Sequence, residues 1–333
     1  MSGAGQGLVG ALGAGRMGRG IVLAFALAGR EAVLLDIKPR AAEAFATLKA
    51  EAEAELRASL ATLVELGVVK PETVDTVFAR IAIVGRDEAP AWLARLGLVF
   101  EGVPETLEAK REAFAYACEF LPKDALLAST SSTILSTELA ALVTQPERFL
   151  NAHWLNPAYL IPLVELQPHP GTAPAATQQL SALLEAVGKV PVVCSAQPGY
   201  IVPRLQSLVM NEAARMIEQG VATAADIDKA TRYGFGIRYA AMGVVEFIDF
   251  GGADILYYAS RYLAGALGDS RYASPAIVDR KMAEGNIGLK SGEGFYDWRA
   301  IDTADYRRTA LARLVELMRM NKVLPPDGET AAR

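Results

Sequence analysis

Apolar runs alternate with helix-like stretches through the first half of the chain. The first run, Leu8-Val9-Gly10-Ala11-Leu12, ends in glycines, and residues with helical spacing follow over 17–28. A second run over 32–35 ends at Asp36. The order strand, glycine turn, helix, strand predicts a right-handed βαβ unit with a parallel sheet. A long helix is predicted over 41–66, and further strands over 81–84, 97–100, 125–128, 149–152 and 163–166.

The pattern changes near Ser195-Ala196-Gln197-Pro198-Gly199, because beyond it the apolar positions have helical spacing almost throughout. The fold class predicted from this change is α/β. A doubly wound domain over residues 1–196, with a helical insertion, precedes an all-helical domain over residues 197–333. The helices expected in the second domain cover 200–219, 224–233, 244–250, 255–263 and 304–320.

Composition narrows the class of protein. Of the 333 residues, 52% are hydrophobic and 21% charged, which is typical of a globular chain. A net charge of −5 argues against a nucleic-acid partner. No run approaches the ~20 apolar residues of a membrane span, and the first residues lack a secretory pattern. Two cysteines, Cys118 and Cys194, favour a reducing cytoplasm, and two histidines leave no His-rich metal site.

A glycine motif marks the first predicted turn. Gly13, Gly15 and Gly18 form a G-x-G-x-x-G that follows a predicted strand and opens a predicted helix, which is the context of a Rossmann-type dinucleotide fold. The first glycine permits the tight turn, the second lets the backbone approach a pyrophosphate, and the third allows close packing. The helix N-terminus favours phosphate. Arg16 and Met17, at the start of that helix, complete the predicted loop contacts.

Asp36 ends the next strand, at the position where an acidic residue accepts hydrogen bonds from the adenosine ribose. It would repel a 2′-phosphate, so NAD is favoured over NADP as the cofactor, although Lys38 and Arg40 nearby weaken that preference. The alternative interpretation is a glycine-rich turn followed by an unrelated aspartate.

A second group of polar residues suggests a reaction site. Ser132 follows the predicted strand 125–128, and His153 follows the predicted strand 149–152. The carboxyl ends of the strands are where an open α/β sheet binds ligands, so both would lie at the edge of the glycine loop. Glu165, in a later extended run, would reach the ring of His153.

Each of these residues has a simpler interpretation when taken alone. His153 would be a structural histidine, Ser132 a helix cap, and Glu165 a solvated strand residue. Their combination favours a site over three separate coincidences. The second histidine, His169, lies in a loop without such neighbours and is predicted to be structural or exposed.

These motifs resemble those of the short-chain L-3-hydroxyacyl-CoA dehydrogenases, which include the 3-hydroxybutyryl-CoA dehydrogenases. The resemblance covers nearly the whole chain, from the glycine loop to Lys290-Ser291-Gly292-Glu293-Gly294-Phe295-Tyr296. Its most specific part is His153 with Asn156-Pro157, followed by Leu163-Val164-Glu165. The run from Leu163 to Pro170 also resembles L-gulonate 3-dehydrogenase and lambda-crystallin.

The resemblance implies a role for each residue. His153 is the expected general base on the 3-hydroxyl, Glu165 orients its imidazole, and Ser132 donates a hydrogen bond to the substrate oxygen. Glu105 and Lys110 match an acidic and basic pair that contacts the cofactor. Asn156 matches a position near the nicotinamide.

One departure from the family concerns the carbonyl of the substrate. The family has an asparagine in a Pro-Gly-Phe-x-x-Asn-Arg pattern, where this chain has Pro203. Proline is well tolerated at a helix start, so the fold need not suffer. An amide that would polarise the carbonyl is lost, so that either another group supplies the donor or the substrate differs.

A second departure concerns coenzyme A. The family carries lysines near the end of its helical insertion, whereas residues 63–70 here contain only Lys70 and also the acidic Glu65. Ser59 matches a hydroxyl contact of the family. The alternative is that other basic residues replace the missing lysines, with Lys49, Arg57 and Arg80 as candidates.

The resemblance therefore implies NAD-dependent oxidation of a short-chain L-3-hydroxyacyl-CoA, its reverse reduction, and a homodimer formed by the helical domain. A rival substrate is a free 3-hydroxy acid or non-CoA ketone, as in L-gulonate or carnitine dehydrogenases. Arg232 and Arg238 are then candidates to hold a carboxylate, unless they are plain surface charge. A third hypothesis is a non-catalytic NAD-binding protein.

Overall fold

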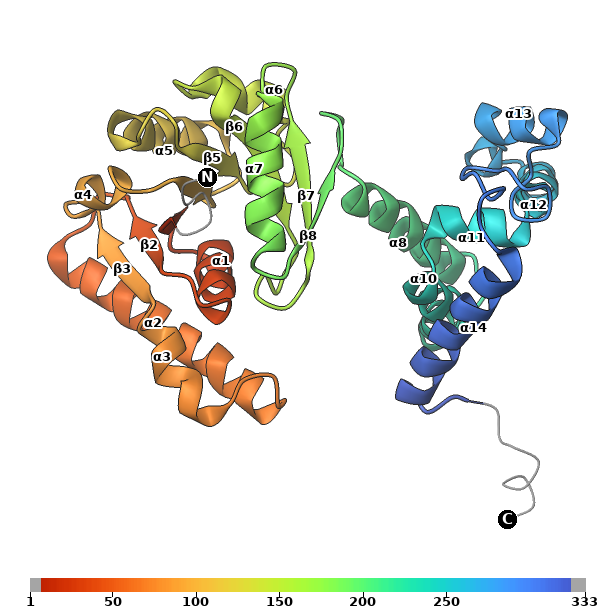
Figure 1. The fold of residues 1–333 in the computed structure, drawn as a ribbon, viewed down its shortest axis with the longest axis horizontal. Coiled ribbons are helices and arrows are strands. Elements are labelled where there is room, and N and C mark those ends of the chain that lie inside the picture. The colour runs from red at the N-terminus through yellow and green to blue at the C-terminus, as the bar shows by residue number, and fades with distance from the viewer. Residues whose placement is uncertain (1–6, 325–333) are drawn as a thin grey trace, which may run out of the picture. The chain divides into compact units, whose positions relative to one another are not determined.

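A computed structural model describes residues 7–324, which divide between Val209 and Met210 into two compact units (Figure 1). The first unit contains one sheet of eight strands in the order β3-β2-β1-β4-β5-β6-β7-β8. These strands are β1 Val9–Leu12, β2 Ala32–Asp36, β3 Ile81–Gly85, β4 Leu98–Glu101, β5 Leu126–Ser129, β6 Phe149–Trp154, β7 Leu163–Pro168 and β8 Val190–Val193. The α/β fold class predicted from the sequence is confirmed.

Helices connect the strands and cover both faces of the sheet. Alternate strand residues point to opposite sides, so that Ala32 and Leu34 join one apolar cluster while Val33 and Leu35 join another. The connecting helices are α1 Arg16–Leu27, α2 Ala42–Glu65, α3 Val74–Phe78, α4 Ala89–Leu93, α5 Leu107–Phe120, α6 Ser136–Leu139 and α7 Pro174–Glu185, with 3₁₀ turns at Pro71–Thr73, Ala140–Leu142 and Pro146–Arg148. Both faces are buried, as the near-continuous apolar strands require.

The sheet contains one antiparallel pair near an edge, beyond the parallel strands that the βαβ pattern predicted. β7 pairs with β6 in antiparallel register, and β8 pairs with β7 in parallel register. β8 was not predicted, because Pro191 within its Val-Pro-Val-Val run argues against a strand and is tolerated only at a sheet edge. The antiparallel pair matters for the site, since it sets two strands side by side in opposite directions.

The second unit consists of helices joined by loops, with isolated β-bridges at Gly288, Glu293 and Asp297 before the last helix. α8 Val202–Glu218 crosses the division between the units. The helix predicted over 224–233 ends at Lys229 and continues as a π-helical segment, η4 Ala230–Gly236. That first part is α9 Ala224–Lys229, and the other helices are α10 Ile237–Ala241, α11 Val244–Gly251, α12 Ala253–Leu267, α13 Ala276–Glu284 and α14 Thr303–Met320, with a 3₁₀ turn at Ser270–Tyr272. The boundary between residues 196 and 197 stays a prediction.

A buried carboxylate organises the loop that precedes α14. Asp249 of α11 is fully buried and accepts hydrogen bonds from the backbone N–H groups of Phe295 (2.9 Å) and Tyr296 (2.8 Å) and from the indole of Trp298 (2.9 Å). Asp249 therefore holds the end of the Lys290–Tyr296 stretch, which carries part of the family resemblance, in a fixed loop conformation. Among residues 7–324, no helix is long and apolar enough to cross a membrane.

Candidate active site

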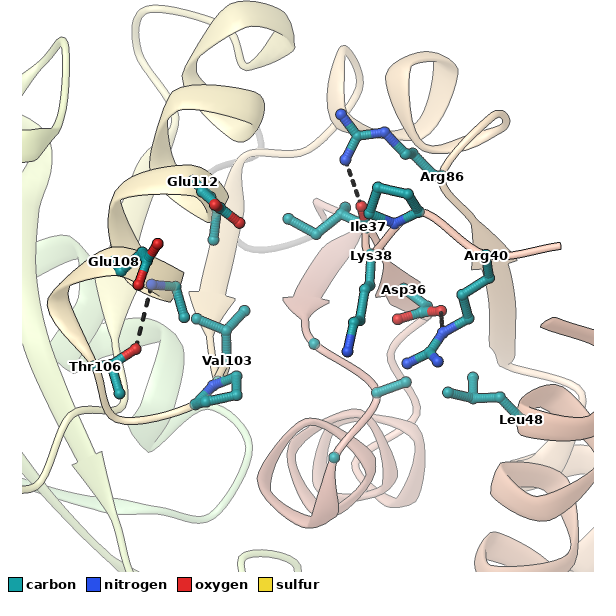
Figure 2. Close-up of a pocket in the computed structure, with 18 residues that line it drawn as sticks. Asp36, Ile37, Lys38, Arg40, Leu48, Arg86, Val103, Thr106, Glu108 and Glu112 are labelled. Carbon is teal, nitrogen blue, oxygen red and sulfur yellow. Dashed lines mark hydrogen bonds and ion pairs between the residues drawn. The ribbon is translucent and has the colours of Figure 1, made fainter. Parts of the chain in front are cut away.

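The glycine loop opens onto a cavity of about 770 Å³ at the carboxyl ends of β1 and β2 (Figure 2). Gly13 has a φ of +103°, and a Cβ at Gly18 would lie 2.1 Å from the carbonyl oxygen of Gly13, so both positions require glycine. A Cβ at Gly15 would meet no atom within 4 Å, which leaves room for a ligand above the helix N-terminus. The size and lining fit a dinucleotide, with phosphate on the N-terminus of α1.

Asp36 lines this cavity, and one oxygen of its carboxylate has a hydrogen-bond partner. Its Oδ2 accepts a 2.6 Å hydrogen bond from Nε of Arg40, four residues along the chain in the loop before α2. Figure 2 shows Asp36, Lys38 and Arg40 on one side of the cavity and Glu108 on the other. Lys38 and Arg40, which weakened the predicted preference for NAD, therefore line the same cavity as Asp36. Arg40 also forms an ion pair with the carboxylate of Asp36.

His153 and Glu165 face each other across the antiparallel pair of strands β6 and β7. They are register partners, and Nδ1 of His153 lies 2.9 Å from Oε2 of Glu165. Both side chains are buried. The prediction that His153 follows its strand is wrong, because β6 extends to Trp154 and His153 is therefore a residue of the strand. The strand is longer than expected because β7 supplies ladder partners up to Trp154.

The remaining oxygen of Glu165 is also engaged. Its Oε1 accepts hydrogen bonds from the backbone N–H groups of Ile201 (2.9 Å) and Val202 (2.8 Å), at the start of α8. Burial alone would raise the pKa of Glu165, but the hydrogen bonds from His153, Val202 and Ile201 outweigh it and lower the pKa. Glu165 is therefore held as a carboxylate beside the imidazole.

Ser132 belongs to a loop that Glu105 gathers around its carboxylate. Oε1 of Glu105 accepts hydrogen bonds from the hydroxyl of Ser131, from the backbone N–H groups of Ser132 and Thr133 (both 3.0 Å), and from the hydroxyl of Thr133. Burial raises its pKa, but the Ser131 hydrogen bond and the charge of Lys110 outweigh burial and lower it to about 2. The structure thus places Glu105 beneath the loop that presents the exposed Ser132.

Lys110 is enclosed below Glu105. Its side chain is fully buried, and Nζ donates to both carboxylate oxygens of Glu101 (3.0 Å each) and lies 3.2 Å from Oε2 of Glu105. Burial raises the pKa of Glu101 against the lowering effect of Lys110. The predicted cofactor contact of Lys110 stays a prediction; in this structure its ammonium contacts the two carboxylates and Ser129.

Three other predicted residues come together in a smaller cavity of about 320 Å³. Arg16, Ser59 and Asn156 line it, from α1, from α2 and from the turn after β6. Arg19 and Glu55, which form an ion pair, line it as well. The cavity therefore joins the glycine-loop helix, the helical insertion and the residues that follow His153.

The remaining predictions fall at the start of α8 and in the second unit. Pro203 occupies the first turn of α8, where the N–H groups of Ile201 and Val202 bond Glu165, so that proline costs the helix no hydrogen bond. Arg238 donates from Nε to the carbonyl of Gly234 (2.9 Å), and Arg232 is exposed beside Tyr233. Their role as carboxylate ligands stays a prediction.

Sequence reasoning missed two buried residues. Tyr200 stacks on the ring of His153, with centroids 4.8 Å apart. Lys189 donates from Nζ to the carbonyls of Ala158 (2.6 Å) and Ile161 (2.9 Å) and so holds the turn between β6 and β7, while burial lowers its pKa to about 8. A polar residue beside an apolar run was the only signal for either of them.

The comparisons place this arrangement among known proteins. The 3-hydroxyacyl-CoA dehydrogenase NAD-binding domain matches residues 8–197, and the C-terminal domain of the same family matches residues 199–298. The chain is 33% identical to a 3-hydroxybutyryl-CoA dehydrogenase of Bradyrhizobium diazoefficiens over 87% of this chain and 95% of that protein. It is 35% identical to a lambda-crystallin homologue of Bos taurus over 77% of this chain and 78% of that one.

Two further matches carry names that differ from each other in the substrate given. The chain is 29% identical to a 5-formyl-3-hydroxy-2-methylpyridine 4-carboxylate 5-dehydrogenase of Mesorhizobium japonicum, over 93% of this chain and 96% of that one. A solved 3-hydroxyacyl-CoA dehydrogenase from Archaeoglobus fulgidus matches with a TM-score of 0.75 at 29% identity, covering 96% of this chain and all of that one. The chain therefore belongs to the 3-hydroxyacyl-CoA dehydrogenase family of NAD-dependent oxidoreductases.

Proposed function

We propose that the protein oxidises a short-chain L-3-hydroxyacyl-CoA, of the 3-hydroxybutyryl-CoA type, to the 3-keto compound with NAD, and catalyses the reverse reduction. The observation that carries the proposal is the buried pair of His153 and Glu165, fixed at 2.9 Å by the register of two strands. A histidine with one nitrogen committed to a carboxylate has its other nitrogen free as a proton acceptor.

The proposed reaction assigns one task to each group. His153 takes the proton of the 3-hydroxyl, the C–H bond at the same carbon breaks as its hydride leaves, and the oxygen becomes a carbonyl. NAD, when bound, accepts that hydride. Glu165 stabilises the imidazolium that forms, and its lowered pKa supports an ionised state in that role. The hydroxyl of Ser132 donates a hydrogen bond to the substrate oxygen.

The acyl-CoA substrate rests on two supports. The cavity lined by Ser59 and Asn156 adjoins the glycine-loop helix, so that it offers room for an extended handle beside the cofactor. The 3-hydroxybutyryl-CoA dehydrogenase of Bradyrhizobium diazoefficiens is similar over almost its whole length. The positive charge that would bind the coenzyme phosphates is smaller than in the family pattern, since Lys70 is the single basic residue at the end of the insertion.

A second candidate substrate is a free 3-hydroxy acid or a ketone without coenzyme A. Two observations favour it. Pro203 stands where the family has an amide donor. Arg19, which lines the smaller cavity, is already paired with Glu55 rather than free to bind a coenzyme phosphate. The Mesorhizobium relative carries a pyridine carboxylate in its name, so this scaffold also accompanies substrates without coenzyme A. Arg232 and Arg238 are the proposed carboxylate ligands for this case.

The deciding experiment measures NADH oxidation with acetoacetyl-CoA, free acetoacetate and a simple ketone under one set of conditions. We expect kcat/KM for acetoacetyl-CoA to exceed that for acetoacetate by more than about tenfold, since a remote handle contributes binding energy to the reaction. A preference for the free acid would replace the first candidate by the second. NADH binding without turnover of any ketone would favour a non-catalytic NAD-binding protein.

We also propose a homodimer in a cytoplasmic setting. Exposed apolar side chains lie at helical spacing on α12, where Ile255 is 62%, Tyr258 64% and Tyr262 73% exposed. A stripe of this kind is typical of a surface that is covered by a partner. Cys118 and Cys194 are both free thiols, as a reducing compartment favours. Light scattering of the parent and of Tyr262→Asp tests the dimer, which the charge is expected to weaken.

A further inference from the structure

The segment between β8 and α8 contacts His153, Glu165 and the residue that precedes Ser132. Tyr200 is 7% exposed, its ring stacks on the imidazole of His153, and its hydroxyl donates a 2.6 Å hydrogen bond to the carbonyl of Ser131. We propose that Tyr200 is a positioning residue, which fixes the plane of the His153 ring and ties it to the loop that presents Ser132. This inference rests on the proposed function, which does not itself use Tyr200.

The ring contact restricts the one motion that Glu165 leaves open. The hydrogen bond to Glu165 holds Nδ1 of His153, yet an imidazole held at one nitrogen can still tilt about that bond. The ring of Tyr200 lies 4.8 Å away between centroids at an interplanar angle of 21°, which is a stacked arrangement. The stack therefore fixes the direction in which the other nitrogen of His153 points.

The hydroxyl joins two elements that are separate in the sequence. It donates to the carbonyl of Ser131 and accepts a 3.0 Å hydrogen bond from Nδ2 of Asn151, which lies on β6 two residues before His153. Nδ2 of Asn151 also donates to the carbonyl of Ile134, at the other end of the serine loop (2.9 Å). The strand of the base and the loop of Ser132 are thus held together through Tyr200 and Asn151.

The backbone of the segment is itself held in place. Tyr200 has a φ of +45°, a left-handed conformation that few residues other than glycine adopt without constraint. The two residues that follow, Ile201 and Val202, both donate to Glu165. One short segment therefore contacts the imidazole through a ring, the carboxylate through backbone N–H groups and the serine loop through a hydroxyl.

The first test is a double-mutant cycle of Tyr200→Phe and Ser132→Ala. Tyr200→Phe keeps the ring and removes the hydroxyl, so we expect kcat to fall about tenfold while KM for NAD stays within about twofold. In the Ser132→Ala background the same change should cost less than about twofold, because no serine hydroxyl remains to be positioned. An equal cost in both backgrounds, or no cost in the parent, would overturn the role of the hydroxyl.

Thr172→Val is the matched control, since the hydroxyl of Thr172 donates 2.7 Å to the carbonyl of Phe149, at the opposite end of β6. It removes a hydroxyl-to-carbonyl hydrogen bond at β6, together with the bond that this hydroxyl accepts from the N–H of His169 (3.0 Å), and should lower thermal stability with kcat unchanged. A similar fall in kcat for Thr172→Val would assign the effect of Tyr200→Phe to general stability and would overturn the inference.

The second test does not need a substrate. The chain has only two histidines, so a spectrum of the imidazole protons contains the signals of His153 and His169 alone. Tyr200→Leu should shift the His153 signal downfield by removing the ring above it, Tyr200→Phe should leave it shielded, and His169 should not move. An unchanged His153 signal in Tyr200→Leu would overturn the stack, whereas absence of turnover in the parent would refute only the proposed function.

Discussion

The two parts of the site differ in how their polar groups are satisfied. Around His153 the protein itself supplies the partners, since Glu165 accepts from the imidazole and from two backbone N–H groups, and Tyr200 closes the ring face. In the glycine-loop cavity Asp36 engages Arg40 through one oxygen, and among the described residues no hydrogen bond is made by the other. The groups proposed for the reaction are held by partners within the protein, whereas Asp36, proposed for the cofactor, keeps one carboxylate oxygen available for a ligand.

This difference follows from what each part has to do. A base and its orienting carboxylate must keep their geometry while charge moves, so rigid partners from the protein are favourable. A cofactor must bind and leave in every turnover, so its contacts must be exchangeable with water. We therefore expect changes around His153 to act on kcat and changes around Asp36 to act on cofactor affinity, and the following variants test that separation.

The largest expected effect is that of His153→Ala. Loss of the proposed general base should lower kcat on the order of 10²–10⁴-fold. NAD affinity should not change, because His153 contacts Glu165 and does not line the glycine-loop cavity. Steady-state assays together with NADH fluorescence titration separate the two quantities. His169→Ala is the control and should keep its activity; turnover retained in His153→Ala would remove His153 from the mechanism.

Asp36→Ala should produce the opposite pattern. The KM for NAD should rise about 10- to 100-fold, since hydrogen bonds to a charged group are worth about 1.5–3 kcal/mol each. KM for NADP should change much less, because the variant also removes a repulsion and frees Arg40 beside the cavity. Glu43→Ala, an exposed carboxylate at the start of α2, is the control. Equal losses for both cofactors would refute the ribose contact.

Glu105→Gln tests a residue that lies between the two parts. It should lower kcat about tenfold by loosening the Ser132 loop, since small displacements of a positioned group are costly. The pKa of Glu105 falls from 4.5 to about 2 on folding, so its contribution to stability is full above pH 4.5 and is lost as the pH drops toward 2.

The variant should therefore lose less stability than the parent between pH 4.5 and 2, measured by urea unfolding at each pH. Glu119→Gln, at an exposed position near the end of α5 that lines neither cavity, is the control for a change of charge. A higher KM for NAD with unchanged kcat would instead place Glu105 among the cofactor contacts that the family resemblance implies.

Most of the fold could be predicted because its signals are local. The apolar runs at β1, β2 and β4 are bounded by turns, and Gly13 and Gly18 can be predicted from sterics alone. The direction of β7 was not predicted, although the short connection over residues 155–162 favours antiparallel pairing, because a parallel crossover needs about a dozen residues or more. That pairing turns His153 and Glu165 from two sequence candidates into neighbours.

The partners of the site residues were the least predictable part. Tyr200 and Lys189 act through backbone carbonyls, and a sequence does not show which carbonyls a fold brings near. The same limit applies to Lys110: the family resemblance implied a cofactor contact for it, and no sequence pattern showed that the fold also encloses it between Glu101 and Glu105.

The smallest expected effect is that of Pro203→Asn, and it tests the part of the site with the fewest donors. Proline in the first turn of α8 breaks no backbone hydrogen bond, so the variant should fold with unchanged stability. A new amide near the substrate carbonyl should raise kcat/KM for acetoacetyl-CoA by up to about tenfold, below the several kcal/mol of an optimally placed donor. Parallel assays with acetoacetate distinguish a general gain from one that needs coenzyme A. No gain, combined with a high rate in the parent, would mean that another group already donates to the carbonyl, and the reaction part of the site would then be as fully provided by the protein as the His153–Glu165 pair.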